Sequence, residues 1–235
     1  SFSDTAMVVI SRVGGEMADL PTNMDGLNYT ENSTEYNDFE PGQHYLSLTK
    51  TEKNMIDMVT KNFANVVLVY NGANTLEMGF VNDYPQIKSV IWCPGTGQTG
   101  FNALGEIVAG EVNPSGHSAD TFVYDLTAAP YFNNIGDFAY TNADSVGYTV
   151  ASQAGGDAKL VPPHFVNYVE GIYVGYKFYE TAAAEGLIDY DKTVQYPFGH
   201  GLSYTTFTQK IDSMTEADGT ITVDVTVTNT GSVAG

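Results

Sequence analysis

Basic residues are scarce in this chain. Lys and Arg total 9 among 235 residues, against 28 Asp and Glu, which makes the formal net charge −19 at pH 7. A charge of this sign repels a phosphate backbone and an anionic membrane surface, so we expect no nucleic-acid partner and no membrane partner. Long apolar runs are missing too, and those near residues 64–70 and 90–93 are far too short to span a bilayer.

Cysteine and metal-ligand patterns are equally sparse. Cys93 is the single cysteine, which excludes an internal disulfide, and its strand-like surroundings predict a buried, unreactive thiol. His44, His117 and His164 have no ligand spacing, so we expect no metal site and no cofactor. His200 lies between two glycines without an identifiable triad partner, which favours a hydrogen-bonded turn over a catalytic role.

The residues that are present indicate a folded α/β domain. The hydrophobic fraction of 43% argues against disorder, and the length suffices for one sizeable core. Apolar runs at Ala6–Ile10, Val66–Tyr70 and Ser89–Trp92 do not alternate, as is typical of parallel strands covered on both faces. With helical patterns between and after them, they predict a layered α/β/α sandwich with a mostly parallel sheet.

Apolar spacing predicts three helices. A capping box at Thr49–Glu52 begins the first, Lys50–Asn62. The second, Gly100–Ala109, follows the glycine-rich stretch Gly95–Gly100, which lacks the lysine of a P-loop and which we interpret as a helix-opening turn. The third covers Phe165–Ala184, where we expect the glycines to allow close approach of a neighbouring element.

Two other stretches have residue patterns that differ from those of the predicted strands and helices. Met17–Leu48 directly follows the first strand and is about thirty residues long without periodicity, which is typical of functional or disordered loops. Because ligands gather at the carboxyl ends of strands in open α/β sheets, its position favours function. From Thr220 onward Val and Ile alternate with Thr and Asp, which predicts a half-buried antiparallel strand.

Three segments together form a family signature. They are Tyr196-Pro-Phe-Gly-His-Gly-Leu-Ser-Tyr-Thr-Thr-Phe207, Tyr168-Val-Glu-Gly-Ile-Tyr-Val-Gly-Tyr-Lys-Phe-Tyr179 and Val112-Asn-Pro-Ser-Gly116. They resemble segments in the second domain of glycoside hydrolase family 3, the β-glucosidase and β-xylosidase family. The resemblance implies that residues 1–206 are the α/β sandwich domain of a retaining β-glycosidase, with a β-glycoside or oligosaccharide as substrate. Val225–Gly231 resembles the opening of a fibronectin III-like domain, whose truncated start would be residues 207–235.

The same resemblance implies a catalytic residue. The segment Val9-Ile-Ser-Arg-Val-Gly-Gly-Glu16 is similar to the strand end that supplies the general acid/base in the family. Arg12, Gly15, Glu16 and Asp19 match the family's pattern, and Met17 and Ala18 depart from it. Such an acid must be protonated when the substrate arrives and ionised afterwards to activate water. Nearby carboxylates raise a carboxyl pKa, and this loop carries four more of them: Glu31, Glu35, Asp38 and Glu40.

Arg12 has two interpretations. As the only arginine in the chain, it braces Asp19 or Glu16 with its forked guanidinium, and so supports the site, or it closes a structural ion pair at the sheet edge. The residue pattern does not decide between these roles.

A retaining mechanism needs a second carboxylate, about 5 to 5.5 Å from the first, as nucleophile. In the family that Asp lies on a separate (β/α)-barrel domain, and no barrel-length segment is present here. We therefore expect the barrel domain of the same parent enzyme as partner, and negligible turnover by this chain alone. Ser118–Asp125 resembles members whose sandwich domain precedes the barrel, which leaves the domain order open. The alternative function is a non-catalytic carbohydrate-binding or interaction module with the same fold.

Overall fold

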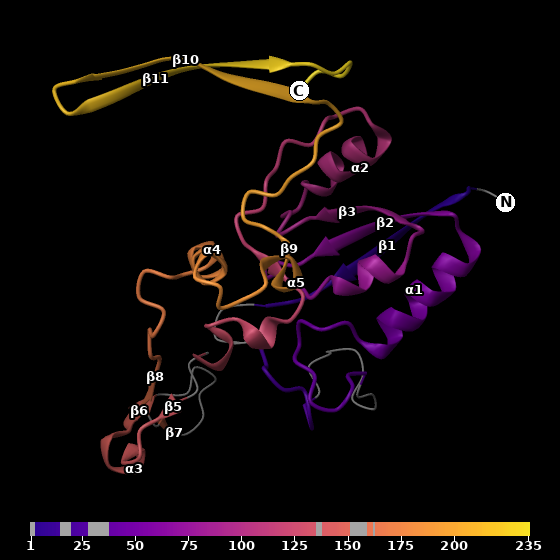
Figure 1. The fold of residues 1–235 in the computed structure, drawn as a ribbon. Helices are drawn as coiled ribbons and strands as arrows, with labels where there is room; N and C mark the ends of the chain where they lie inside the picture. The colour runs from indigo at the N-terminus through magenta and orange to yellow at the C-terminus, as the bar shows by residue number, and fades with distance from the viewer. Residues whose placement is uncertain (1–2, 15–19, 28–37, 135–137, 151–158, 162) are drawn as a thin grey trace.

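A three-stranded parallel sheet forms the centre of the computed structural model, which describes residues 3–14, 20–27, 38–134, 138–150, 159–161 and 163–235. The strands β1 (Thr5–Ser11), β2 (Asn65–Asn71) and β3 (Ile87–Trp92) are hydrogen-bonded in the order β1-β2-β3 (Figure 1). Parallel pairing requires a crossover, and α1 (Lys50–Asn62) provides the one between β1 and β2. The three predicted strands and the α/β class are confirmed.

The main core lies between the sheet and α1. Val8 and Ile10 point from β1 toward this core and pack with Ile56 of α1, and β2 adds buried apolar residues. On the opposite face of β1, Met7 and Val9 are half-exposed. Alternate residues of β1 therefore face different environments, and α1 covers only one of them.

The first two predicted helices are confirmed. The Glu52 backbone N–H donates to Thr49 Oγ1 at 3.2 Å, and the Thr49 N–H donates to Glu52 Oε2 at 2.9 Å, which completes the predicted capping box. The second helix, α2 (Phe101–Ala109), ends at Gly110, whose φ of 76° is the left-handed conformation that glycine adopts without strain. None of the residues of α2 is fully buried.

The third predicted helix is wrong over its first half. Only α4 (Tyr176–Ala184) is helical, and residues 165–175 form turns and extended backbone. Gly171 and Gly175 have φ values of 59° and 62°, so the chain reverses at positions where a right-handed helix needs negative φ. Residues 165–175 have the apolar spacing of a helix, but these two glycines interrupt it. They therefore do not allow the predicted close approach of a neighbouring element to a helix.

Short elements connect the sheet to the second half of the chain. Three two-stranded antiparallel sheets are formed by the pairs β4 with β9, β5 with β8 and β6 with β7. In chain order these elements are η1 (Gly79–Asp83), β4 (Phe122–Val123), η2 (Leu126–Ala128), η3 (Phe132–Asn134), β5 (Phe138–Ala139), α3 (Ala143–Val146), β6 (Tyr148–Val150), β7 (Lys159–Val161), β8 (His164–Phe165), α5 (Tyr190–Thr193) and β9 (Val194–Tyr196).

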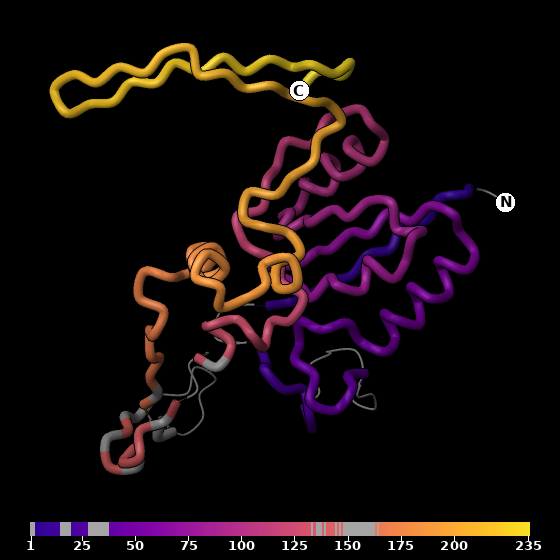
Figure 2. Tube along the Cα trace, viewed as in Figure 1, coloured from indigo at the N-terminus to yellow at the C-terminus, as the bar shows by residue number. Residues whose placement is uncertain are grey.

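The C-terminal segment is a long hairpin that extends away from the body (Figures 1 and 2). Its strands β10 (Phe207–Ala217) and β11 (Thr220–Asn229) pair antiparallel around a turn at Asp218 and Gly219, both with positive φ. The predicted antiparallel strand from Thr220 is confirmed, but its predicted half-burial is wrong, because β11 is exposed along its whole length. Among the described helices, none has the length and apolar character needed to cross a membrane.

Candidate functional site

The predicted site begins where β1 ends. Glu16 and Asp19 lie outside the described residues, whereas Arg12 directly follows β1 and is described. Arg12 is 8% exposed, and its backbone N–H donates to the Asn71 carbonyl at 3.1 Å, at the end of β2. The guanidinium therefore starts from the carboxyl edge of the parallel sheet, which is the edge where α/β folds bind ligands.

Arg12 makes a forked ion pair with Glu52. Its Nη1 and Nη2 donate to the two Glu52 oxygens at 2.5 and 2.7 Å. The other N–H groups donate to backbone carbonyls: Nε to Tyr45 at 2.8 Å, Nη2 to Ser47 at 2.7 Å and Nη1 to Ser11 at 2.9 Å. Burial disfavours the charged guanidinium, but the hydrogen bonds and attraction from Glu52 outweigh it and raise the pKa of Arg12.

These bonds give Arg12 a structural position. All five guanidinium donors are used, so the side chain holds the end of β1 against residues 45–47 and the first turn of α1. The predicted loop Met17–Leu48 starts just after Arg12 and finishes at these same residues. Arg12 thus ties together the two ends of that loop, and the geometry is that of the structural ion pair.

Two of the four additional loop carboxylates are described, and both contact α1. Asp38 Oδ1 accepts from the Thr51 backbone N–H at 3.0 Å, which satisfies a donor in the first turn of the helix. Glu40 pairs with Lys50 at 3.7 Å, with both side chains exposed. The loop therefore returns to the body at α1 before it continues to the buried residues 44–47.

A buried polar cluster that the sequence did not reveal lies beside this loop. The His44 ring, Ser47 hydroxyl and Glu77 carboxylate are within 3.2 Å of one another: Glu77 Oε1 is 2.9 Å and Ser47 Oγ 3.1 Å from His44 Nε2. Glu77 Oε1 also accepts from the Leu126 backbone N–H at 2.8 Å. Roughly thirty residues separate Glu77 from the other two, so no spacing pattern in the sequence predicts the cluster. The connection between β2 and η1 carries Glu77 to His44 and Ser47.

The cluster contains the residue types of a hydrolase triad but a different geometry. In a triad, serine contacts Nε2 of the histidine while the acid binds Nδ1. Here Ser47 and Glu77 both contact Nε2, and Nδ1 accepts from the Leu46 backbone N–H at 3.1 Å. His44 therefore has no free acceptor nitrogen with which to activate Ser47, and the cluster fastens the loop to the β2–η1 connection.

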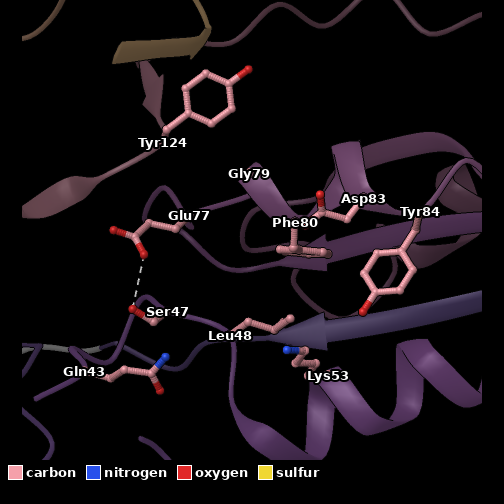
Figure 3. A pocket seen from close by; sticks show the side chains of 10 residues that line it. All are labelled: Gln43, Ser47, Leu48, Lys53, Glu77, Gly79, Phe80, Asp83, Tyr84 and Tyr124. Carbon is pink, nitrogen blue, oxygen red and sulfur yellow. Dashed lines mark hydrogen bonds between the residues drawn. The ribbon is translucent and has the colours of Figure 1, made fainter. Parts of the chain in front are cut away.

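A pocket of about 300 Å³ opens next to the cluster, at the lower end of the range for small-ligand sites. Figure 3 shows Glu77, hydrogen-bonded to Ser47, on one wall, and the rings of Phe80, Tyr84 and Tyr124 around the opening. Aromatic faces beside hydrogen-bonding groups are compatible with a polyhydroxylated ligand. Among the described residues, no group of three or more His, Cys, Asp and Glu side chains forms a metal site.

The remaining candidates from the sequence are His200, Cys93 and the stretch Gly95–Gly100. His200 lies in the predicted turn: its N–H donates to the Pro197 carbonyl at 3.0 Å, and its ring stacks on Tyr196. Cys93 directly follows β3 and is only half-buried, so its predicted full burial is wrong, although this burial raises the pKa of the thiol and favours the unreactive form. Gly95–Gly100 forms the predicted turn, with the Gly100 N–H bonded to the Thr96 carbonyl.

Comparison with known proteins identifies the family. The family model described as the glycosyl hydrolase family 3 C-terminal domain matches residues 2–176. The chain belongs to glycosyl hydrolase family 3. Relatives of the family 3 domain include β-glucosidase A of Butyrivibrio fibrisolvens, 30% identical over 100% of this chain and 27% of the relative, and a β-glucosidase of Ruminococcus albus, 30% identical over 99% and 19%.

Solved structures of β-glucosidases share the fold of this family 3 domain. The enzyme of Paenibacillus barengoltzii matches with a TM-score of 0.68 and 28% identity over 98% of this chain and 20% of that one. β-Glucosidase 3B of Thermotoga neapolitana, in complex with glycerol, matches with a TM-score of 0.67 and 26% identity over 100% of this chain and 26% of that one. The chain thus spans 19–27% of the length of these proteins.

Proposed function

We propose that this chain is the second domain of a retaining β-glycosidase and that Glu16 is its general acid/base. Among β-glycosidases, we favour a β-glucosidase. The observation that carries the proposal is the similarity to β-glucosidases over 99–100% of the chain. The position of Arg12 supports it, because Arg12 fixes the point where the chain leaves the sheet, four residues before Glu16. A carboxylate at that carboxyl edge faces the region where ligands bind.

In the proposed mechanism Glu16 works in two protonation states. As the acid, it donates a proton to the departing glycosidic oxygen while an Asp on the barrel domain of the parent enzyme attacks the sugar. As the carboxylate, it then accepts a proton from the water that hydrolyses the glycosyl-enzyme. Asp19 supports Glu16 within the loop, and Arg12 acts through the loop ends and touches no substrate. Without the nucleophile, this chain alone has negligible turnover.

The test is Glu16→Gln in the full-length parent enzyme, with Glu40→Gln as the matched control. Hydrolysis of glycosides with poor leaving groups should slow by about 10²–10⁴-fold, whereas activated aryl glycosides, which need no proton, should form the glycosyl-enzyme at nearly the normal rate. Azide should accelerate turnover of the aryl glycosides by the variant, because a small anionic nucleophile needs no general base. Glu40→Gln should show neither effect, since Glu40 is exposed and paired with Lys50.

Equal, mild losses for both substrate types without an azide effect would contradict the assignment. The acid/base role would then pass to Asp19, tested by the same pair of substrates. If substitution of neither Glu16 nor Asp19 reduced turnover by the parent enzyme, while this chain still bound sugar, the results would favour the non-catalytic carbohydrate-binding module.

A further inference from the structure

The pocket beside the buried polar cluster contains a carboxylate with one acceptor position left over. A carboxylate offers about four lone-pair positions for hydrogen bonds. Glu77 Oε1 contacts His44 Nε2 at 2.9 Å and accepts from the Leu126 N–H at 2.8 Å. Glu77 Oε2 accepts from Ser47 Oγ at 3.2 Å, and among the described residues it has no second donor. Because the Glu77 side chain is 21% exposed and lines the pocket, a ligand can reach this position.

The Glu77 carboxylate is held in place before a ligand arrives. His44 Nδ1 accepts from the Leu46 N–H, so the hydrogen of the neutral ring is on Nε2 and is donated to Glu77. With three donors around it, the carboxylate has little conformational freedom to lose on binding. A ligand hydroxyl that donates to Oε2 gains a charge-assisted hydrogen bond, which is about twice as strong as a neutral one.

Two tyrosine rings of the pocket wall are held by their own hydroxyls. Tyr84 Oη donates to Asp57 Oδ1 at 2.6 Å, and Tyr124 Oη accepts from Asn82 Nδ2 at 3.3 Å. The position of Tyr124 also depends on Gly79, because a Cβ there would lie 3.1 Å from the ring. Both rings line the pocket (Figure 3). Aromatic rings fixed in this way can pack against the C–H face of a sugar ring.

Side chains at the rim add further donors and acceptors. Lys53 and Asp83 line the opening and are exposed, and neither side chain forms a hydrogen bond or ion pair with another described residue. Gln43 Oε1 accepts from the Glu40 N–H at 2.8 Å, which leaves the N–H groups of its amide as donors. The pocket therefore offers donors on Lys53 and Gln43 and acceptors on Glu77 and Asp83. Such a mixture suits hydroxyl groups, each of which both donates and accepts.

Charge and size narrow the class of ligand. Glu77 and Asp83 outweigh Lys53 in the pocket lining, and the whole chain has a net charge of −19. A phosphate or a uronate therefore meets net repulsion, whereas a neutral ligand does not. The volume of about 300 Å³ is at the lower end for small-ligand sites, which favours one sugar ring over an enclosed oligosaccharide.

From these contacts we infer that the pocket is a binding site for a single neutral sugar ring. Glu77 and Lys53 are its polar contacts, and Tyr124 is its stacking surface. The site is formed by this domain alone and needs no residue of the barrel. The inference goes beyond the proposed function, because it concerns sugar binding at Glu77 and not proton transfer by Glu16.

Titration of this chain with methyl β-D-glucopyranoside, followed by the backbone amide signals in NMR spectra, tests the inference. The signals of Gly79, Phe80 and Tyr124 should shift with a Kd on the order of 1 mM, the scale for one small neutral ligand. Glucuronate, the anionic analogue, should bind more weakly by at least about tenfold. Unchanged signals at sugar concentrations well above that Kd, or equal affinity for glucuronate, would overturn the inference.

Variants of this chain separate contacts with the sugar from effects on the fold. Lys53→Met should weaken binding about two- to tenfold, because one hydrogen bond is lost. Lys61→Met is the matched control and should change nothing, since Lys61 is exposed in the last turn of the same helix. Equal affinities of these two variants would overturn the inference.

A second pair of variants tests the stacking surface. Tyr124→Ala should weaken binding about tenfold through the lost ring, whereas Tyr204→Ala, at a ring that is 50% exposed and outside the pocket, should not. If Tyr124→Ala does not fold, the lysine pair still decides, because Lys53 is exposed.

Failure of this inference is distinguishable from failure of the proposed function, because the titration measures binding by this chain without turnover. Binding at the pocket without the acid/base signature of Glu16→Gln in the parent would contradict the proposed function alone. That signature without binding at the pocket would contradict this inference alone.

Discussion

At the scale of single residues, Arg12 is the most connected side chain of the candidate site. It is buried, its charge is balanced by one carboxylate, and its remaining donors bind the carbonyls of Tyr45 and Ser47 at the loop end and of Ser11 at the end of β1. A buried ion pair contributes little compared with an apolar pair of the same size, but removal of one member leaves the other charge uncompensated. The pair therefore specifies where the loop ends lie more than it adds to stability.

Arg12→Met should lower the free energy of unfolding by about 3–5 kcal/mol, because Glu52 is left partly buried without a counter-charge. Lys50→Met, which breaks the exposed pair with Glu40, should change it by at most about 1 kcal/mol. Urea unfolding of this chain, followed by circular dichroism, gives both values. The double variant Arg12→Met, Glu52→Met should be more stable than Arg12→Met alone, and equal losses for Arg12→Met and Lys50→Met would refute the structural role.

At the scale of elements, local conformation decides where helices end. Residues 165–184 carry the apolar spacing of a helix throughout, but helical geometry begins only after Gly175. A single glycine likewise ends α2: Gly110, with a φ of 76°, caps the helix at its C-terminus. Gly105, in contrast, lies within the helix. Glycine therefore weakens the helix at position 105, whereas at position 110 it allows the backbone conformation that ends the helix.

Substitution of these two glycines by alanine should change stability in opposite directions. Gly105→Ala should raise the free energy of unfolding by about 0.5–1 kcal/mol, since nothing lies within 4 Å of the added Cβ and alanine favours the helix. Gly110→Ala should lower it by about 1–2 kcal/mol, because a Cβ strains the left-handed conformation. Urea denaturation measures both, and a shift of the same sign for the two variants would contradict the observed end of α2.

At the scale of the whole molecule, the hairpin and the body are separate in structure. All residues of β11 are exposed. Among the described residues, four hydrogen bonds connect the ends of the hairpin segment to the body: the Thr230 N–H to the Thr206 carbonyl, the Thr206 and Thr230 hydroxyls to each other, Thr205 to Asn229, and Asn113 to Ala234. One face of β11 is apolar, with Ile221, Val223, Val225 and Val227, and remains uncovered. We propose that residues 207–235 belong to a fibronectin III-like domain, with the domain boundary after residue 206.

Removal of residues 207–235 should leave the body folded. The four deleted hydrogen bonds contribute about 1 kcal/mol each, so the free energy of unfolding should fall by at most about 4 kcal/mol while unfolding stays cooperative. Differential scanning calorimetry of residues 1–206 beside the whole chain measures this. A shortened chain that unfolds without a cooperative transition would place the boundary elsewhere.

Short-range sequence patterns determined the central elements of this protein. Apolar runs identified β1, β2 and β3, and the spacing of Thr49 and Glu52 identified the start of α1, because each signal depends on residues that are neighbours in the chain. Motif segments likewise sufficed for the family. The position of Arg12 at the end of β1 followed from the same local pattern.

Tertiary structure decided what those residues contact. Glu52 lies 40 positions from Arg12, and Glu77 lies 33 from His44, so only the folding of the loop onto the sheet brings each pair together. It also decided that β11 stays exposed and that Cys93 is half-buried. Sequence spacing carries no signal for such features, because they depend on packing between distant segments and on the surfaces that remain uncovered.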